Sequence, residues 1–105
     1  MRNDNLNLWK LKHGEAFLNS FMKCADYVNK GKKCKFGESI KAFVNLGLLE
    51  GIPNSIISSI KNVDVKLSFT NKGVSLYDQL IGLLNRGIIY REENGNLNWI
   101  NFQFV

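Results

Sequence analysis

The chain has few of the residues on which small enzymes and disulfide-rich domains depend. Its 105 residues include one proline, two cysteines and one histidine. Two cysteines are too few for a disulfide scaffold, so we expect a reduced, cytoplasmic setting. No apolar run approaches the roughly 18 residues of a membrane span. The first ten residues hold no uninterrupted hydrophobic region, so we expect no secretory signal.

Groups that could carry out chemistry are also scarce. His13 is the single histidine, and Cys24 and Cys34 have no second Cys or His pair with which to form a zinc site. The glycines are scattered and form neither a phosphate-binding loop nor a dinucleotide fingerprint. Glu92 and Glu93 are adjacent, so on a strand they point to opposite faces. We therefore expect no enzymatic activity, no metal site and no cofactor.

What the chain does have is the composition of one compact domain and an uneven distribution of charge. About 45% of its residues are hydrophobic and 22% are charged, which predicts a single domain over residues 1–105. Residues 1–37 hold eight Lys and Arg against three Asp and Glu, whereas residues 38–105 hold six of each. The net charge of +5 is thus confined to the first third. Such an excess predicts a partner that carries phosphate or an acidic surface.

Apolar residues at helical spacing predict four helices. The clearest covers residues 15–29, where Phe17, Phe21, Cys24 and Val28 fall on one face. A second helix contains residues 40–48 and should end near residues 51–53, and a short third one should begin after a cap at Asn54. The fourth is expected from a capping box at Ser75 and Asp78 to Gly87.

Alternation of apolar and polar residues predicts the strands. Residues 5–11 alternate, which favours a strand or extended arm inside an N-terminal segment 1–14. Residues 63–69 alternate over seven positions and predict a second strand. Asn94-Gly95 between two apolar stretches predicts a C-terminal hairpin over residues 88–105.

A two-residue Asn94-Gly95 loop would fix the register of that hairpin. Tyr90 would then lie opposite Trp99 and Arg91 opposite Asn98, with Ile100 on the core side. On this register Trp99 lies on the outer face, where a large apolar side chain needs a partner. A dimer contact, a DNA contact and packing under the N-terminal arm all remain open.

The stretch from Gly73 to Arg91, GVSLYDQLIGLLNRGIIYR, resembles the C-terminal half of winged helix-turn-helix proteins. In that family a turn leads into the recognition helix, which ends at a glycine and is followed by a two-stranded wing. The resemblance implies an α+β winged helix-turn-helix fold, with helices packed on a small antiparallel sheet and residues 88–105 as the wing. Two features depart from the family: the fourth helix looks about one turn short, and residues 63–69 read as a strand.

The resemblance also implies DNA binding. The small size and basic first third are similar to accessory DNA-binding proteins of conjugative plasmids or phages, with roles in transfer, replication or transcription regulation. Lysines at positions 30–35 would hold phosphates, unless they merely form a solvated loop. Side chains at the wing tip and on the fourth helix would contact bases. The residues expected to contact DNA are Lys32, Lys33, Lys35, Lys72, Gln79, Arg86, Arg91, Asn94, Asn96 and Asn98.

Two functions follow as alternatives. The first is a sequence-specific double-stranded DNA-binding protein that acts as a homodimer and reads bases mainly with its wing. Trp99 and Phe104 would lie at the dimer interface, because terminal strands leave edges that need covering. The second is a non-enzymatic protein-interaction module, such as a phage inhibitor or an assembly adaptor, whose basic patch meets an acidic protein surface.

Overall fold

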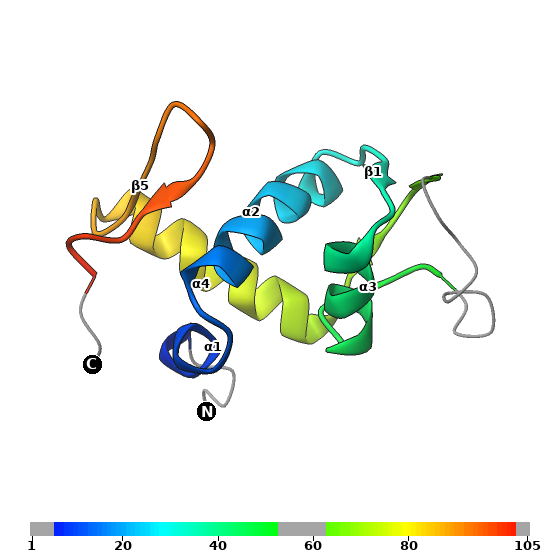
Figure 1. The fold of residues 1–105 in the computed structure, drawn as a ribbon, viewed down its shortest axis with the longest axis horizontal. Helices are drawn as coiled ribbons and strands as arrows, with labels where there is room; N and C mark the ends of the chain where they lie inside the picture. The colour runs from blue at the N-terminus through cyan, green and yellow to red at the C-terminus, as the bar shows by residue number, and fades with distance from the viewer. Residues whose placement is uncertain (1–5, 53–62, 103–105) are drawn as a thin grey trace.

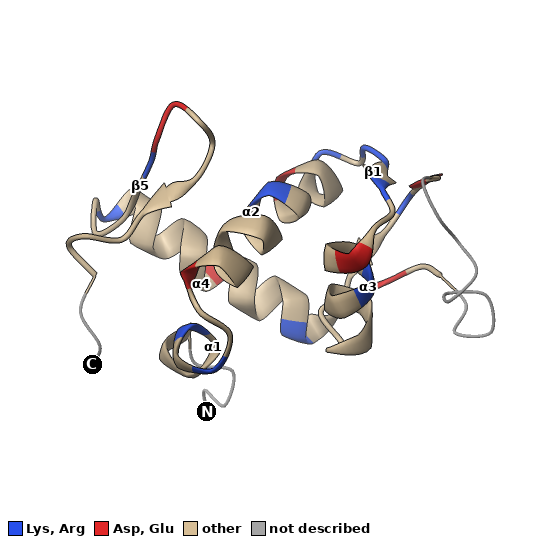
Figure 2. Ribbon diagram, viewed as in Figure 1, with Lys and Arg blue, Asp and Glu red and all other residues tan. Residues whose placement is uncertain are grey.

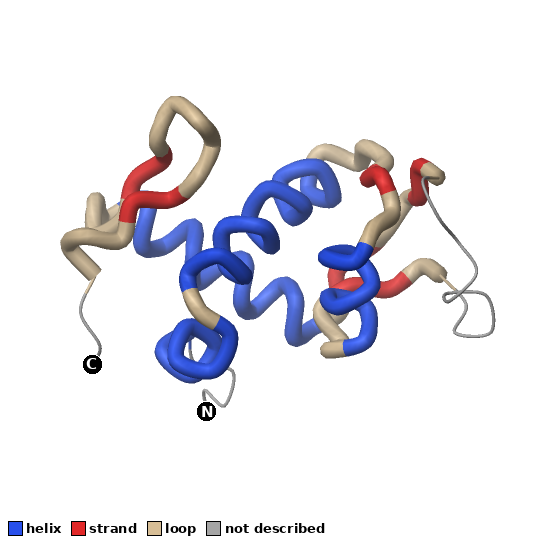
Figure 3. The backbone as a smooth tube through the Cα atoms, viewed as in Figure 1, coloured by secondary structure: helices blue, strands red, loops and turns tan. Residues whose placement is uncertain are grey.

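A computed structural model describes residues 6–52 and 63–102. It contains four helices and six short strands, so the expected α+β class is confirmed (Figures 1 and 3). The helices are α1 (Leu6–His13), α2 (Glu15–Asn29), α3 (Glu38–Asn45) and α4 (Asn71–Asn85). The strands are β1 (Cys34–Lys35), β2 (Leu49–Glu50), β3 (Asp64–Val65), β4 (Ser68–Phe69), β5 (Tyr90–Arg91) and β6 (Leu97–Asn98). The short helix expected after Asn54 lies outside the described residues.

The core forms where α2 packs on α3 and α4. The expected helix over residues 15–29 is confirmed, and its residues Leu18, Phe21, Met22 and Ala25 are fully buried. Phe21 meets Phe43 of α3 edge to face, with ring centroids 5.5 Å apart. From α4, the buried side chains are Leu76, Leu80 and Leu83, the leucine stripe that the sequence predicts.

The N-terminal segment is a helix, so the strand or arm expected over residues 5–11 is wrong. Leu6 and Trp9 are the buried residues of α1, and their spacing of three places both on one helical face. Leu8, whose alternation with Leu6 suggested a strand, is 58% exposed. The Leu6 N–H at the start of α1 donates to Gln79 Oε1 of α4 at 2.7 Å. This long-range bond satisfies one of the N–H groups that the start of an α-helix leaves without an intrahelical partner.

Helices α2, α3 and α4 all end on the same three-residue pattern, Asn-x-Gly, at Gly31, Gly47 and Gly87. Each glycine has a positive φ, between 72° and 78°. At every end the glycine N–H and the next N–H bond back to helix carbonyls, as Lys32 N–H does to Tyr27 O at 2.9 Å. These are Schellman caps, which satisfy carbonyls that the helix would otherwise leave unpaired. The cap at Gly47 ends α3 before the expected stop near residues 51–53.

Helix α4 begins four residues before the expected capping box. The Thr70 hydroxyl is its N-cap and accepts the Gly73 N–H at 3.0 Å, so Ser75 lies inside the helix. With 15 residues, α4 is as long as α2, and the prediction of a shortened helix is wrong.

Residues 63–69 do not form one strand. Asp64–Val65 pairs with β1, whereas Ser68–Phe69 pairs with β2, both antiparallel. Lys66 and Leu67 separate the two pairs, and Leu67 is buried. Within the described residues there are three separate two-stranded pairs in place of the small sheet that the sequence predicts.

The C-terminal hairpin forms with a register one residue away from the expected one. Tyr90 lies opposite Asn98 and Arg91 opposite Leu97, so the expected Tyr90–Trp99 pair is wrong. The Glu92 N–H donates to Asn96 O at 2.8 Å, which encloses three loop residues, and Gly95 takes a φ of 87°. A shift of one residue exchanges the two faces of a strand. Trp99 is therefore buried, and Ile100 is 79% exposed.

Candidate nucleic-acid interface

A basic loop leaves the end of α2 in a fixed direction. The Schellman cap at Gly31 holds the backbone of Lys30 and Lys32, through bonds from both N–H groups to the last turn of α2. The caps of α3 and α4 place the apolar residues Leu48 and Ile88 at the position that Lys32 occupies. A buried side chain normally accompanies this motif. Here the position carries an exposed lysine instead.

The other end of the loop is anchored in the core. Cys34 and Phe36 are each 5% exposed, and the Phe36 N–H donates to Val63 O at 2.8 Å. Strand β1 pairs with β3 so that Lys35 lies opposite Asp64. Extended by one residue beyond the paired positions, this register would place Lys66 opposite Lys33.

We call Lys30, Lys32, Lys33, Lys35 and Lys66 the lysine cluster. All five residues are exposed, and Figure 2 shows positive charge gathered where α2 ends and β1 begins. The two ion pairs found within the described residues join Lys10 to Glu15 and Arg91 to Asp26, so neither uses the cluster. Like charges that face each other across strands destabilise a fold. The cluster is thus a concentration of positive charge suited to an external anion.

Among the paired residues of β1 and β3, the acidic side chain is Asp64, which lies opposite Lys35. Sequence analysis predicts Lys32, Lys33 and Lys35 as phosphate contacts, and the structure brings them together. It adds Lys66, which the sequence prediction omits. The alternation over residues 63–69 places Lys66 on the polar side of that segment. The sequence does not show which strand the segment pairs with.

At the hairpin, the Arg91 side chain is 41% exposed but is bonded within the molecule. Its guanidinium donates to both carboxylate oxygens of Asp26 on α2, at 2.8 and 3.4 Å. Tyr77 of α4 donates its hydroxyl to the same carboxylate at 3.1 Å. Burial raises the pKa of the Tyr77 phenol, and the adjacent Asp26 raises it further, so the phenol stays a donor. Arg91 therefore joins the hairpin to α2 and α4. Its guanidinium could contact a DNA base only after breaking its hydrogen bonds to Asp26.

Two of the asparagines expected at the wing also have partners within the chain. Asn94 Oδ1 accepts the Asn96 N–H at 2.9 Å and shapes the turn. Asn98 donates to Glu92 Oε2 at 2.8 Å, and its own oxygen accepts the Ile100 N–H. Glu92 and Glu93 make the hairpin tip acidic (Figure 2). The hairpin tip is thus a poor surface for approaching phosphates.

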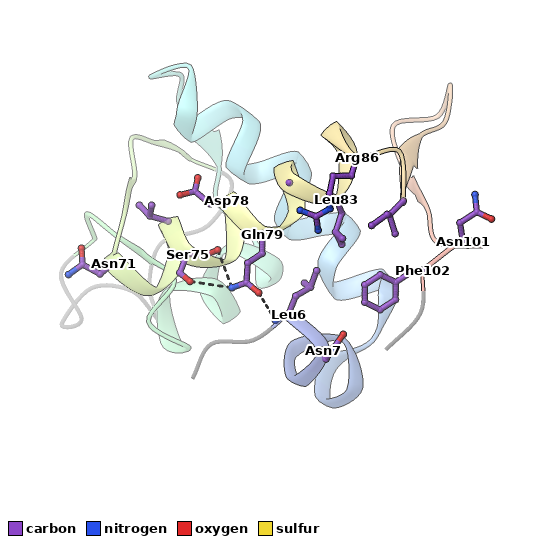
Figure 4. A pocket seen from close by; sticks show the side chains of 13 residues that line it. Leu6, Asn7, Asn71, Ser75, Asp78, Gln79, Leu83, Arg86, Asn101 and Phe102 are labelled. Carbon is purple, nitrogen blue, oxygen red and sulfur yellow. Dashed lines mark hydrogen bonds between the residues drawn. The ribbon is translucent and has the colours of Figure 1, made fainter. Parts of the chain in front are cut away.

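The side chains expected on α4 lie apart from the lysine cluster. Gln79 accepts the Leu6 N–H and donates to Ser75, which joins α4 to α1. Lys72 lies 3.5 Å from Leu46 O, with its ammonium 5.6 Å from the centre of the Trp9 ring. Arg86 is exposed and lines a groove of about 960 Å³ beside α4 (Figure 4). Asp78 lines the same groove, so its charge is mixed.

Trp99 packs within its own chain. Its indole N–H donates to Asn19 Oδ1 of α2 at 3.2 Å, and Lys10 of α1 lies 5.6 Å from its ring centre. The outer-face position expected for Trp99 is therefore wrong, and of its three possible roles the structure shows packing against the N-terminal segment. Phe104, the other residue expected at a dimer interface, lies outside the described residues. The homodimer stays a prediction without support from Trp99.

The remaining reactive side chains are two thiols and one imidazole. Cys24 and Cys34 are buried with their sulfurs 3.6 Å apart, and burial raises the pKa of the Cys24 thiol, with a further contribution from Cys34. His13 stacks between Trp9 and Phe17 at 5.3 and 4.5 Å, and its pKa is lowered by burial and by Lys12. Across residues 6–52 and 63–102, no three His, Cys, Asp or Glu side chains gather as a metal site.

No helix in the described part of the chain is long and apolar enough to cross a membrane. The chain matches no known family model, no curated protein and no solved structure.

Proposed function

We propose that this chain is a non-enzymatic double-stranded DNA-binding protein of winged-helix type that holds the phosphate backbone with its lysine cluster. The observation that supports this most directly is the gathering of five exposed lysines outside any ion pair of the described residues, four of them on a loop anchored at both ends and the fifth, Lys66, next to β3. Neutralising phosphates with lysines releases condensed counterions, which supplies sequence-independent affinity.

The chemistry of lysine fits this role. An ammonium is a compact point charge that can meet a phosphate from many directions, whereas bidentate contacts to bases favour arginine and asparagine. Two of the three arginines are described: Arg91 is bonded to Asp26, and Arg86 lies in the α4 groove. The cluster therefore sets affinity. Any preference for sequence would come from an exposed side chain such as Arg86 on α4.

The test compares two pairs of exposed lysines with the same change in charge. Lys32→Ala with Lys33→Ala removes part of the cluster. Lys12→Ala with Lys23→Ala removes two exposed lysines, one on α1 and one on α2, that belong neither to the cluster nor to the expected DNA contacts. Binding to a random-sequence duplex is measured by fluorescence anisotropy at several salt concentrations. We expect the cluster variant to lose affinity, and its log–log salt slope to flatten by about 0.9 for each phosphate that is no longer neutralised. The control should keep the wild-type slope.

Three results would overturn the proposal. Equal losses in both variants would show that net charge alone drives binding. An unchanged slope in the cluster variant would make the cluster a solvated loop. If the wild-type chain did not bind duplex DNA at physiological salt, the protein-interaction function would replace DNA binding. Matching melting temperatures ensure that folded variants are compared.

A further inference from the structure

Two thiols lie at the base of the lysine cluster. Cys24 is on the third turn of α2 and Cys34 begins β1, the strand that follows the end of α2 in Figure 1. Their sulfurs approach to 3.6 Å. They are free, and their side chains are 9% and 5% exposed. The chain between them carries Lys30, Lys32 and Lys33, so a bond between the sulfurs would close a ring around most of the cluster.

We propose that Cys24 and Cys34 form a reversible disulfide when the protein meets a hydroperoxide, and that this bond fixes the lysine cluster in its binding conformation. The second half rests on the proposed function, whereas the first half does not. A disulfide needs its sulfurs about 2.05 Å apart. Helix α2 is 15 residues long and β1 only two, so the short strand is the side that moves to close the remaining gap.

The oxidation balances with hydrogen peroxide as the oxidant, which is small enough to reach largely buried thiols. We assign the first attack to Cys34, because β1 is only two residues long and its movement gives the oxidant access to this thiol. Its thiolate attacks one peroxide oxygen, the O–O bond breaks, and a sulfenic acid and hydroxide form; the hydroxide takes up the thiol proton. The Cys24 sulfur then attacks the Cys34 sulfur and the S–O bond breaks. The hydroxyl leaves as water with the Cys24 proton. Two thiols and one peroxide thus give one disulfide and two waters.

The disulfide should tighten DNA binding because it orders the loop before the DNA arrives. Strand β1 is held by only two residue pairs with β3. The same register, extended by one residue, would bring Lys33 toward Lys66. That repulsion favours loosening of the loop. A covalent tie to α2 removes this freedom, and preorganisation lowers the entropy cost of binding. We expect binding to random duplex to tighten by about 2- to 10-fold.

The experiment treats the folded chain with hydrogen peroxide and then divides the sample. Intact mass and peptide mapping test for the loss of two hydrogens and for a Cys24–Cys34 crosslink. Anisotropy measures affinity for the same random duplex before oxidation, after oxidation and after reduction with dithiothreitol. Dithiothreitol reverses a disulfide but leaves methionine sulfoxide in place, so the reduced sample controls for methionine oxidation. Cys24→Ala and Cys34→Ala should each abolish the crosslink and the change in affinity.

The two halves of the proposal fail separately. A peptide map that shows only sulfinic acid or crosslinks between chains would disprove the Cys24–Cys34 disulfide within one chain. A Cys24–Cys34 crosslink with unchanged or weaker binding overturns the locking of the cluster and leaves the DNA-binding proposal intact. If neither redox form binds the duplex, the proposed function fails, while the mass measurement still decides whether the disulfide forms.

Discussion

Gly73 lies in the first turn of α4, and the backbone of Leu48 approaches it more closely than any side chain would allow. A Cβ at Gly73 would lie 2.0 Å from Leu48 O. Gly82, on the same helix, would place its Cβ 3.4 Å from the flexible end of Arg86. Both glycines are helical and lack a positive φ. They differ in what surrounds them.

Gly73→Ala should lower the free energy of unfolding by about 1–3 kcal/mol, because the new methyl group forces α4 away from Leu48. Gly82→Ala should raise it by up to about 1 kcal/mol, since alanine is the better helix former and the space is open. Urea unfolding followed by circular dichroism measures both. Equal effects from the two substitutions would mean that helix propensity, and not the close approach of Leu48, decides the outcome at Gly73.

Other single residues act as long-range ties that no local pattern indicates. Asn19 on α2 accepts both the Leu97 N–H and the Trp99 indole N–H, each at 3.2 Å. Asp26, further along α2, holds Arg91 and Tyr77. In the sequence these are an asparagine and an aspartate inside an amphipathic helix. Only the folded chain shows that they bind the hairpin and α4, and that Arg91 therefore serves the fold.

At the scale of elements, the hairpin shows how one residue of register decides which side chains form the core. With a three-residue loop, Leu97 and Trp99 face inward and Ile100 faces solvent. A two-residue loop would have exchanged them. The Asn94-Gly95 pair predicts a hairpin correctly, because glycine favours the positive φ that the turn needs. It does not distinguish the two loop lengths, since both can use a glycine there.

Substitutions at neighbouring positions test the register. Trp99→Ala should cost about 3–5 kcal/mol of stability, because it removes a buried ring and leaves a cavity. Ile100→Ser should change stability by less than about 0.5 kcal/mol, since its side chain is exposed. Thermal or urea unfolding of the two variants gives both values. A larger loss of stability from Ile100→Ser than from Trp99→Ala would support the register expected from the sequence.

The helix ends, in contrast to the hairpin, follow closely from local sequence. Three Asn-x-Gly sites give three Schellman caps with the same pair of backbone bonds. Such caps are local, since they depend on one glycine and on carbonyls within the same turn. The helix starts differ from each other in this respect. Thr70 caps α4 locally, by accepting the N–H of Gly73 three residues on, whereas the N–H at the start of α1 donates to Gln79 of α4.

At the scale of the whole molecule, the concentrated positive charge should cost stability. Lys33 and Lys66 face each other by continuation of the β1–β3 register, and the chain carries a net charge of +5. Self-repulsion of this kind destabilises a compact state and is screened by salt. Such a loss of stability is expected of a surface that binds a polyanion.

Lys33→Gln should therefore stabilise the protein by about a few tenths of a kcal/mol at low ionic strength, and the gain should vanish at high salt. Lys12→Gln, on α1 away from the cluster, should have little effect at either salt concentration. Melting temperatures of both variants in low-salt and high-salt buffer provide the measurement. A Lys33→Gln variant that melts below the wild type would show that Lys33 stabilises the loop and does not strain it.

Features that depend on neighbouring residues could be predicted from the sequence. These are the α+β class, the α2 helix with its buried face, the end of α4 at Gly87, the C-terminal hairpin and the positive charge of the first third. Features that depend on partners far along the chain became visible only in the tertiary structure. Contacts with α4 turned residues 6–13 into a helix, and two partner strands divided residues 63–69 between them. Folding also brought Lys66 to the basic loop and Cys34 to Cys24. The physical reason is the same in each case: local patterns fix backbone preference and amphipathic faces, whereas pairing and burial depend on which distant surface a segment meets.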